Sequence, residues 1–322
     1  MNERINRQLN RSMPFITPCS VGMGVLLANH LTSFSYLVPW IFAFMTFTGS
    51  LGSTFKSLQR VIYQPMKMVT ILAILHIVMP VWAWGIGNLA FNGDSDTIIG
   101  VMLAAIIPTG ITSYIWVSIY QGNTALALSV ILVDTLVSPF IVPYSISLMA
   151  GESVVINGWG MMRGLVGMVV LPSITGMLIN ELTRGKAKQR LESRLSPFSK
   201  IGLAAVVMIN SSVVAPFLLH INAKLILIAV VAFFVSASGY FFSLVSGKFL
   251  KWEQEDVVTL MFTGGMRNIS AGAVIAVTYF EPSVAVPVVV GMLFQQVLAS
   301  LFGQFLHKSY QKPLYKKIIP QE

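Results

Sequence analysis

Charged residues are scarce in this chain. They make up only 10% of its 322 residues, whereas soluble globular domains carry about 25%. Hydrophobic residues make up 55% of the sequence, and the mean hydropathy is +0.76. The apolar runs are continuous and about 20 residues long, the length that an α-helix needs to cross a bilayer; they lack the alternation of a β-barrel strand. The composition excludes a soluble globular protein and predicts an all-α polytopic membrane protein.

The sequence also lacks the residue patterns of common enzyme classes. It has one cysteine, Cys19, so no internal disulfide can form. Cys19 lies in the first apolar run, away from the helix breaks described below, which argues against a thiol-based site. There is no paired intramembrane aspartate motif, no HExxH zinc motif and no phosphate-binding loop. We therefore expect a protein that is not an enzyme and has no metal site or organic cofactor.

Ten apolar runs have the length of a membrane span. They occupy approximately 12–31, 33–51, 66–91, 97–120, 123–149, 157–181, 198–219, 222–247, 257–280 and 282–306. Of the 21 lysines and arginines, all except Arg163, Lys224 and Arg267 fall on the cytoplasmic side if both chain ends are cytoplasmic. Positive charge concentrates in cytoplasmic loops, so this distribution supports ten spans with that orientation. It also accounts for the net charge of +9 without a nucleic-acid partner.

The ten predicted spans divide into two halves of five, residues 1–151 and 152–322. Because five is odd, the second half enters the membrane from the opposite side, as in the inverted repeats of many secondary transporters. The fourth span of each half contains a predicted helix break. The residues at these breaks are Pro108, Thr109 and Gly110 in the first half and Gly264 and Gly265 in the second. A lone break is usually a harmless kink, but matched breaks point to a transport site.

Three ionisable side chains lie deep in the apolar runs: His76, Asp134 and Arg267. Each follows the predicted start of its span by 10 or 11 residues. The three spans cross in the same direction, so a rise of about 1.5 Å per residue puts the side chains at one depth. Isolated charges there are costly, so we expect Asp134 and Arg267 to pair unless one faces water. A structural ion pair and a transport site, with Asp134 or His76 taking up a proton, both fit this pattern.

Several segments resemble bacterial members of the bile acid:sodium symporter (BASS) family. They are Gly122-Asn-Thr-Ala-Leu126, Thr135-Leu-Val-Ser-Pro139, Gly265-Met-Arg-Asn268 and Val284-Ala-Val-Pro287. With the ten spans and the paired breaks, the resemblance covers nearly the whole chain. It implies a core domain and a panel domain, with the broken helices 4 and 9 crossing in the core. It also implies sodium-coupled transport of organic anions, such as bile acids or pantoate-like carboxylates, by alternating access across the bacterial cytoplasmic membrane.

The residues at the family's sodium sites are changed in this sequence. The family's glutamate at the second break falls on Thr263, its glutamine there falls on Arg267, and its third-span glutamine falls on His76. Hard cations need oxygen ligands and are repelled by a fixed positive charge, so we expect weak sodium binding. Arg267 is predicted to act in place of a sodium ion, with Asp134 as its partner and His76 as a tuning or protonating group.

The resemblance places a small organic anion beside the crossing of the broken helices. The predicted substrate-binding residues are Thr112, Ser113, Asn268, Gln295 and Gln296. The half-helix N-termini after each break would add positive dipole for a carboxylate. We expect a monomer that contacts only its substrate and the lipid bilayer. The alternatives are ordinary sodium symport through main-chain carbonyls and remaining hydroxyls, or a non-transporting membrane sensor that uses the pocket only to bind.

Overall fold

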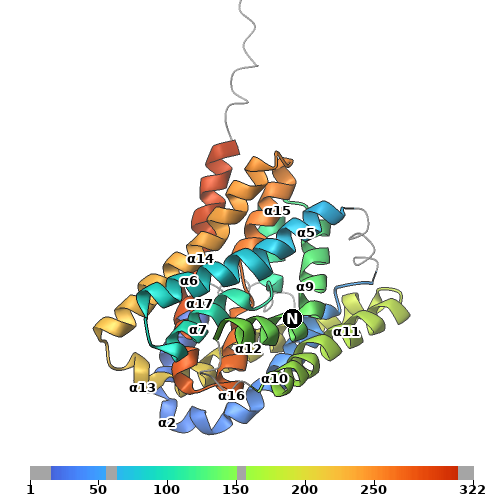
Figure 1. The fold of residues 1–322 in the computed structure, drawn as a ribbon. Helices are drawn as coiled ribbons and strands as arrows, with labels where there is room; N and C mark the ends of the chain where they lie inside the picture. Colours follow the sequence, from blue (N-terminus) through green and yellow to red (C-terminus); the bar gives the residue numbers. More distant parts are fainter. Residues whose placement is uncertain (1–15, 56–63, 151–156, 311–322) are drawn as a thin grey trace, which may run out of the picture.

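The computed structural model describes residues 16–55, 64–150 and 157–310, and Figure 1 shows them as a bundle of helices. No strand occurs within these ranges. A short apolar helix, Ile16–Leu26, comes first. The elements that follow it are α2 (Ala28–Leu31), η1 (Thr32–Leu37), α3 (Val38–Ser50), α5 (Pro65–Ala73), η2 (Ile74–Val78), α6 (Met79–Ala90), α7 (Ser95–Ile106), α8 (Ile111–Ile119), α9 (Thr124–Ala150), α10 (Gly158–Leu165), η3 (Val166–Val170), α11 (Leu171–Leu182), η4 (Lys188–Glu192), α12 (Ser193–Val213), α13 (Ala215–Leu218), α14 (Ala223–Phe249), α15 (Gln254–Gly265), α16 (Ile269–Tyr279) and α17 (Pro282–Tyr310).

The helices have the length and the surface of membrane spans. Within the described residues, seven are long and apolar enough to cross a membrane, or eight if the bent pair α7 and α8 counts as one span. Large apolar side chains project from the surface: Trp40 is 75% exposed, and Leu89 and Phe249 are each 83% exposed. Such a surface suits lipid better than water. The protein is an all-helical, polytopic integral membrane protein.

Two of the ten predicted spans are not among these helices. The run 12–31 contains the shorter helix Ile16–Leu26, and the run 198–219 overlaps α12 and α13. The ten-span count, the two inverted repeats and the cytoplasmic chain ends therefore stay predictions. The boundary predicted between residues 151 and 152 lies outside the described residues.

The helices pack in two sets that meet at α16. α3 packs against α11 and α12, whereas α14 packs against α15 and α17, and α7 packs against α6 and α17. α16 contacts α12 and α3 from the first set and α17 and α7 from the second. The chain segment just before α16 therefore lies where the two sets of helices adjoin.

The first helix break is caused by a proline. α7 ends at Ile106 and α8 begins at Ile111, and the two helices are bent by 51°. A proline lacks an N–H and disfavours helical geometry at the preceding residue. Ile107 is accordingly extended, with ψ at 140°. Pro108, Thr109 and Gly110 form the connection, as the sequence predicts.

The second break lies slightly later than the sequence predicts. α15 ends at Gly265 and α16 begins at Ile269, so the connecting residues are 266–268. Met266 is extended, with φ at −97° and ψ at 138°. Asn268 is the N-cap of α16, and its side chain accepts a hydrogen bond from the Ala271 N–H. The prediction that Gly264 and Gly265 form the break is wrong, because both residues complete the last turn of α15.

These two glycines instead let α15 approach α14. A Cβ at Gly264 would lie 2.1 Å from Ser243 Oγ, and a Cβ at Gly265 would lie 2.4 Å from the Tyr240 ring. Tyr240 is fully buried and stacks on Phe302, with ring centroids 4.9 Å apart. Close packing leaves that ring little room to move.

Gly265→Ala is therefore expected to lower the free energy of unfolding by about 1–3 kcal/mol, the usual cost of overpacking. Gly85→Ala is the matched control, because nothing lies within 4 Å of a Cβ at that position of α6. The control should be neutral, or stabilising by up to about 1 kcal/mol, because alanine favours a helix more than glycine does. Thermal unfolding of the purified protein measures both. Equal melting temperatures would contradict the proposed role of Gly265.

Candidate functional site

The two breaks are in direct contact, and we call this contact the crossing: residues 107–110 beside residues 266–268. The Asn268 N–H donates to the Pro108 carbonyl at 2.8 Å, and Thr109 Oγ1 donates to the Met266 carbonyl at 3.0 Å. Gly110 permits the approach, since a Cβ there would lie 3.3 Å from the Asn268 Cα. Two main-chain carbonyls at the breaks, those of Pro108 and Met266, are thus satisfied inside the protein by a main-chain N–H and by a threonine hydroxyl, as the apolar surroundings require.

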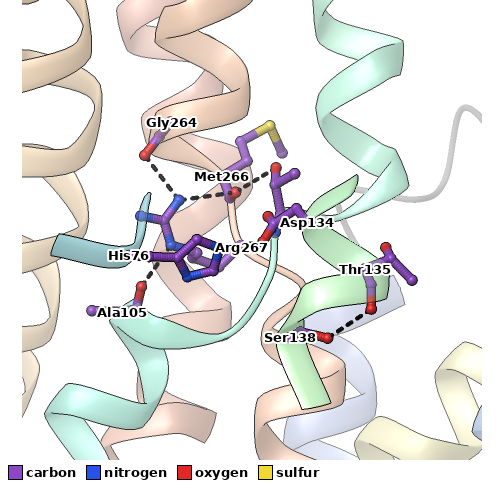
Figure 2. A network of polar contacts seen from close by, with 9 residues as sticks. His76, Ala105, Asp134, Thr135, Ser138, Gly264, Met266 and Arg267 are labelled. Carbon is purple, nitrogen blue, oxygen red and sulfur yellow. Dashed lines mark hydrogen bonds and ion pairs between the residues drawn. The ribbon is translucent and has the colours of Figure 1, made fainter. Parts of the chain in front are cut away.

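Main-chain carbonyl oxygens hold the side chain of Arg267 (Figure 2). Nε donates to the Ala105 carbonyl at 2.8 Å, and Nη1 donates to the carbonyls of Gly264 at 2.9 Å and Met266 at 3.4 Å. Arg267 is only 5% exposed. We call these three oxygens the carbonyl site. Oxygen ligands of this kind also suit a hard metal cation, so the guanidinium occupies a position that is chemically suited to a cation.

The carbonyl site has negative potential because two helices end there. Ala105 lies in the last turn of α7, and Gly264 lies in the last turn of α15. Carbonyl groups in a last helical turn have no intrahelical partner and carry the negative end of the helix dipole. The guanidinium supplies hydrogen bonds and positive charge together. This explains how an arginine is retained at this depth without touching a carboxylate.

Asp134 binds His76 and the first break. Its Oδ1 lies 2.7 Å from His76 Nε2, and its Oδ2 accepts a hydrogen bond of 2.6 Å from the Thr109 N–H. Asp134 is fully buried. Thr109 links it to Arg267, because the Thr109 hydroxyl and the guanidinium both donate to the Met266 carbonyl. We call His76, Asp134 and Arg267 the ion cluster.

The predicted direct pairing of Asp134 with Arg267 is not formed. The ion pairs within the described ranges place Asp134 with His76, and the guanidinium bonds only to carbonyls. The physical reason is that the helix breaks expose main-chain groups that bind each side chain separately: the Thr109 N–H binds Asp134, and the three carbonyls bind Nε and Nη1 of Arg267. The buried Nη2 of Arg267 has no hydrogen-bond partner among the described residues. Depth along a span predicts the proximity of the three side chains but not their partners.

His76 lies in a distorted part of its helix. The π-helical turn η2 contains it and precedes Pro80. Pro80 has no N–H for the carbonyl four residues earlier, which is that of His76, so the helix widens there. In the described part of the chain, the buried His76 Nδ1 has no hydrogen-bond partner. One imidazole nitrogen of His76 is thus bonded to Asp134, whereas the other is left without a partner.

Two predicted site residues lie beside the ion cluster with their hydroxyls turned to their own helices. Thr263 Oγ1 donates to the Thr259 carbonyl at 2.7 Å, and Ser113 Oγ donates to the Gly110 carbonyl at 2.7 Å. Both side chains are buried. Such local hydrogen bonds are common for serine and threonine in helices. In this structure both hydroxyls therefore bond to a main-chain carbonyl three or four residues earlier in the chain and make no hydrogen bond to the ion cluster.

A cavity of about 240 Å³ lies beside the crossing. Its lining includes Thr112, Asn268, Gln295 and Gln296, which are four of the five predicted substrate residues, and also Arg267. The helices α3, α11 and α12 add hydroxyl side chains at Thr46, Ser50, Ser173 and Ser199, and Ser53, just after α3, adds another. Among the described residues that line the cavity, none is aspartate or glutamate.

Hydrogen bonds fix the orientation of three amide side chains in this lining. Each amide oxygen accepts from an N–H group: Gln295 Oε1 from Arg267 N at 3.3 Å, Gln296 Oε1 from Trp116 Nε1 at 3.1 Å, and Asn268 Oδ1 from Ala271 N at 3.3 Å. Backbone and indole N–H groups donate but cannot accept, so each amide must turn its oxygen toward its partner. Each amide then has its NH₂ group left for the cavity. A lining of donors without carboxylates favours an anion.

Sequence reasoning missed the contribution of α3, α11 and α12 to this lining. The hydroxyl residues on these helices are far apart in the chain and form no pattern that marks a site. Lys200 on α12 also lines the cavity. From the distribution of positive charge alone, Lys200 is expected only to mark the cytoplasmic side of the membrane. The sequence does carry one sign of this role. Lys200 lies just inside the predicted span 198–219, whereas a lysine that only sets the orientation of the chain would lie outside a span.

A helical membrane protein with two broken helices in contact and a polar cavity beside them belongs to the class of secondary transporters. The model of the Sodium Bile acid symporter family matches residues 39–221. The chain belongs to this family, which confirms the resemblance inferred from its sequence. It is therefore a membrane transporter of the sodium/solute symporter type rather than an enzyme.

Individual relatives agree with this classification. The chain is 53% identical to the uncharacterized protein YbaS of Bacillus subtilis (strain 168), over 95% of this chain and 100% of YbaS. It is 25% identical to the uncharacterized sodium-dependent transporter YocS of the same organism, over 87% of this chain and 88% of YocS. It is 26% identical to the probable sodium/metabolite cotransporter BASS1, chloroplastic, of Oryza sativa subsp. japonica, over 78% of this chain and 61% of that protein.

Proposed function

We propose that the protein is a secondary transporter of a small organic anion in which Arg267 takes the place of a coupling sodium ion. One observation carries this proposal: the guanidinium is hydrogen-bonded to all three oxygens of the carbonyl site. A fixed positive charge at this position repels a second cation. Its hydrogen bonds also use oxygens that the second cation would need as ligands. Substrate binding then needs no sodium ion at this site.

The cavity lining supports an anionic substrate. Besides the three amide NH₂ groups, the first residues of α8 and α16 line the cavity, namely Ile111 and Thr112 and Ile269 and Ser270. N–H groups in a first helical turn lack intrahelical partners and carry the positive end of the helix dipole. The volume of about 240 Å³ is below the roughly 300–1,000 Å³ of pockets for drug-sized ligands. A small pantoate-like carboxylate therefore fits better than a bile acid.

The proposed transport cycle moves the two sets of helices against each other. The set of α3, α11 and α12 corresponds to the panel domain, and the set that contains the crossing corresponds to the core domain. Both sets line the cavity, so a shift between them would change the side from which the substrate enters. In this proposal the halves 1–151 and 152–322 are inverted repeats. The protein is a monomer in a bacterial cytoplasmic membrane, with both chain ends in the cytoplasm.

The pair of His76 and Asp134 is the proposed site of proton coupling. A proton taken up by this pair would raise the net charge of the ion cluster by one, close to the anion site. Arg267 from the crossing and Tyr240 from α14 are the other ionisable groups at the cluster. Uptake would then respond to a proton gradient.

His76→Gln tests this coupling, because glutamine can donate to Asp134 but cannot change charge. We expect the variant to lose the response of uptake to an imposed proton gradient. His220→Gln is the matched control: His220 is exposed, its Nδ1 lies 3.1 Å from the Pro216 carbonyl, and it is not part of the cavity lining. Initial uptake rates in proteoliposomes, with and without a pH difference, measure the effect. A wild-type response in His76→Gln would rule out this proton site.

Ordinary sodium:anion symport is the second candidate. It is favoured by the names of the relatives YocS and BASS1, which describe sodium-dependent transport, and by the hydroxyls of Thr109 and Ser113 at the first break. A thermal-shift screen of small organic anions, run in sodium and in potassium salts, separates the two candidates. We expect carboxylates to raise the melting temperature equally in both salts. Stabilisation that requires sodium would favour the second candidate.

A further inference from the structure

We infer that Asn210 is an anion-binding residue of the opposite-facing state, in which the substrate reaches the crossing from the other side of the membrane. Asn210 lies on α12, where the two sets of helices adjoin, and it is not among the described residues that line the cavity. This inference rests on the proposed function, because it extends the transport cycle of the same cavity. It assigns to Asn210 a contact with the substrate carboxylate that forms only when this part of the interface opens.

The position of Asn210 along α12 is the first observation. Residues at intervals of four, three and four share one face of this helix: Leu203, Val207, Asn210 and Val214. Leu203 lines the cavity, α12 packs against α16, and α13, which follows Val214, contacts α17. Asn210 is therefore about 10 Å beyond Leu203 along the helix, between the cavity and the start of α17. We call this region, Val207, Asn210 and Val214 of α12 against α16 and α17, the closed interface.

The unpaired amide of Asn210 is the second observation. Asn210 is 0% exposed, as are Val207 and Val214 on the same face of α12. Over residues 16–55, 64–150 and 157–310, neither Oδ1 nor Nδ2 of Asn210 has a hydrogen-bond partner. A buried amide without hydrogen bonds is costly, and a leucine of similar size would avoid this cost. The amide therefore destabilises the closed interface and favours a conformation that opens it.

A purely structural role does not explain this amide. Asn180, on α11 of the same set, is also buried, and both of its polar groups are used. Its Nδ2 donates to the Ser53 carbonyl at 3.1 Å, and its Oδ1 accepts from the Lys188 N–H at 3.3 Å. Asn180 thus connects segments of one set of helices, whereas Asn210 connects nothing in this conformation.

The transport cycle supplies a ligand for Asn210. When α12 separates from α16, the closed interface opens and water reaches the amide. A carboxylate that enters from this side passes Asn210 on its way to the crossing. The NH₂ group of Asn210 donates to that carboxylate, as the amides of the cavity lining do in the proposed function.

Cysteine labelling tests the opening without any substrate. The chain has one cysteine, Cys19, so Cys19→Ser gives a background into which Asn210→Cys, Ser199→Cys and Ile209→Cys are introduced singly. A membrane-impermeant maleimide is added to right-side-out and to inside-out membrane vesicles. Ser199→Cys, in the cavity lining, is expected to react from one side, and Asn210→Cys from the opposite side.

Ile209→Cys is the matched control for this labelling. Ile209 is 6% exposed and lies seven residues after Gly202, on the face of α12 where a Cβ at Gly202 would lie 3.1 Å from Ile41 of α3. This face packs within one set of helices and stays closed when the two sets separate. The control is expected to react from neither side.

Replacement of the amide tests its contact with the substrate. Asn210→Leu is expected to raise the melting temperature, because it removes a buried unpaired amide, whereas Asn180→Leu is expected to lower it, because two hydrogen bonds are lost. Stabilisation by carboxylates should persist in Asn210→Leu, since Asn210 does not line the cavity in this conformation.

Uptake is measured in vesicles of the orientation in which the maleimide reaches Asn210→Cys. Asn210→Leu is expected to lower the initial rate at low carboxylate concentration at least about tenfold, the effect of one hydrogen bond to a charged group. Asn210→Ser keeps a hydroxyl donor and is expected to retain part of that rate.

The outcomes separate this inference from the proposed function. The opening is overturned if Asn210→Cys reacts no faster than Ile209→Cys, or if it reacts from the same side as Ser199→Cys. A lower melting temperature with wild-type uptake in Asn210→Leu overturns the contact with the substrate and leaves a structural role. In each case, carboxylates that stabilise the wild-type protein leave the proposed function standing. A wild-type protein that no carboxylate stabilises contradicts the proposed function, whatever the labelling shows.

Discussion

Replacing Arg267 with glutamine is expected to lower sodium-free uptake at least about 100-fold, because removing one member of a buried charged network typically costs about 3–5 kcal/mol. The glutamine has no charge and cannot satisfy Ala105, Gly264 and Met266 together, so carbonyl oxygens are left without donors. The vacated carbonyl site, with the new amide oxygen beside it, has the ligand type that sodium needs. We therefore also expect sodium to restore part of the uptake.

This effect is measured as uptake into proteoliposomes in sodium salts and in potassium salts. The substrate is the carboxylate that raises the melting temperature of the wild-type protein most. Arg163→Gln is the matched control, because Arg163 is exposed and its guanidinium lies over the Trp159 ring at 4.9 Å, outside the cavity lining. The control is expected to transport like the wild type. Full sodium-free uptake by Arg267→Gln would show that the guanidinium is not the coupling cation.

Asp134→Asn is expected to lower the free energy of unfolding by about 3–5 kcal/mol, the range found when one partner of a buried charged pair is removed. Asp134 is fully buried and accepts from Thr109 N–H while contacting His76. An asparagine keeps one oxygen for these contacts but leaves the charge of Arg267 without a nearby negative group. Thermal unfolding of the purified protein measures the loss.

Two comparisons test that interpretation. Asp94→Asn is the control: its partner Lys224 lies 2.7 Å away, and the two side chains are 29% and 55% exposed, so the pair is worth only about 0–1 kcal/mol. The double variant Asp134→Asn, Arg267→Gln should be destabilised by less than the sum of the single changes, because it buries no unbalanced charge. Strict additivity would mean that the two charges do not interact.

Helical geometry and proline chemistry account for the parts of this site that could be predicted from the sequence. A constant rise per residue places His76, Asp134 and Arg267 at one depth, and the structure brings them together through contacts with the crossing. Pro108 marks the first break because its ring excludes helical geometry at Ile107. These rules act within one helix, so they hold whatever the helix packs against.

The features that could not be predicted depend on contacts between helices. Gly264 and Gly265 look like a break, but their function is to let α15 lie against Tyr240 and Ser243. The carbonyl site is built from main-chain atoms, which carry no sequence signature. Lys200 reaches the cavity only because α12 packs against α3 and α16. In the sequence alone, a lysine at this position indicates only which side of the membrane is cytoplasmic.

The most direct test of whether Arg267 replaces the sodium ion is an uptake measurement on the wild-type protein in proteoliposomes. The substrate is the carboxylate that raises the melting temperature most. Its uptake is measured with an inward sodium gradient and with an equal inward potassium gradient. Both gradients should be clamped to the same membrane potential and pH. We predict equal initial rates in the two salts. An initial rate that depends strongly on sodium would contradict the assignment of Arg267 as the tethered cation.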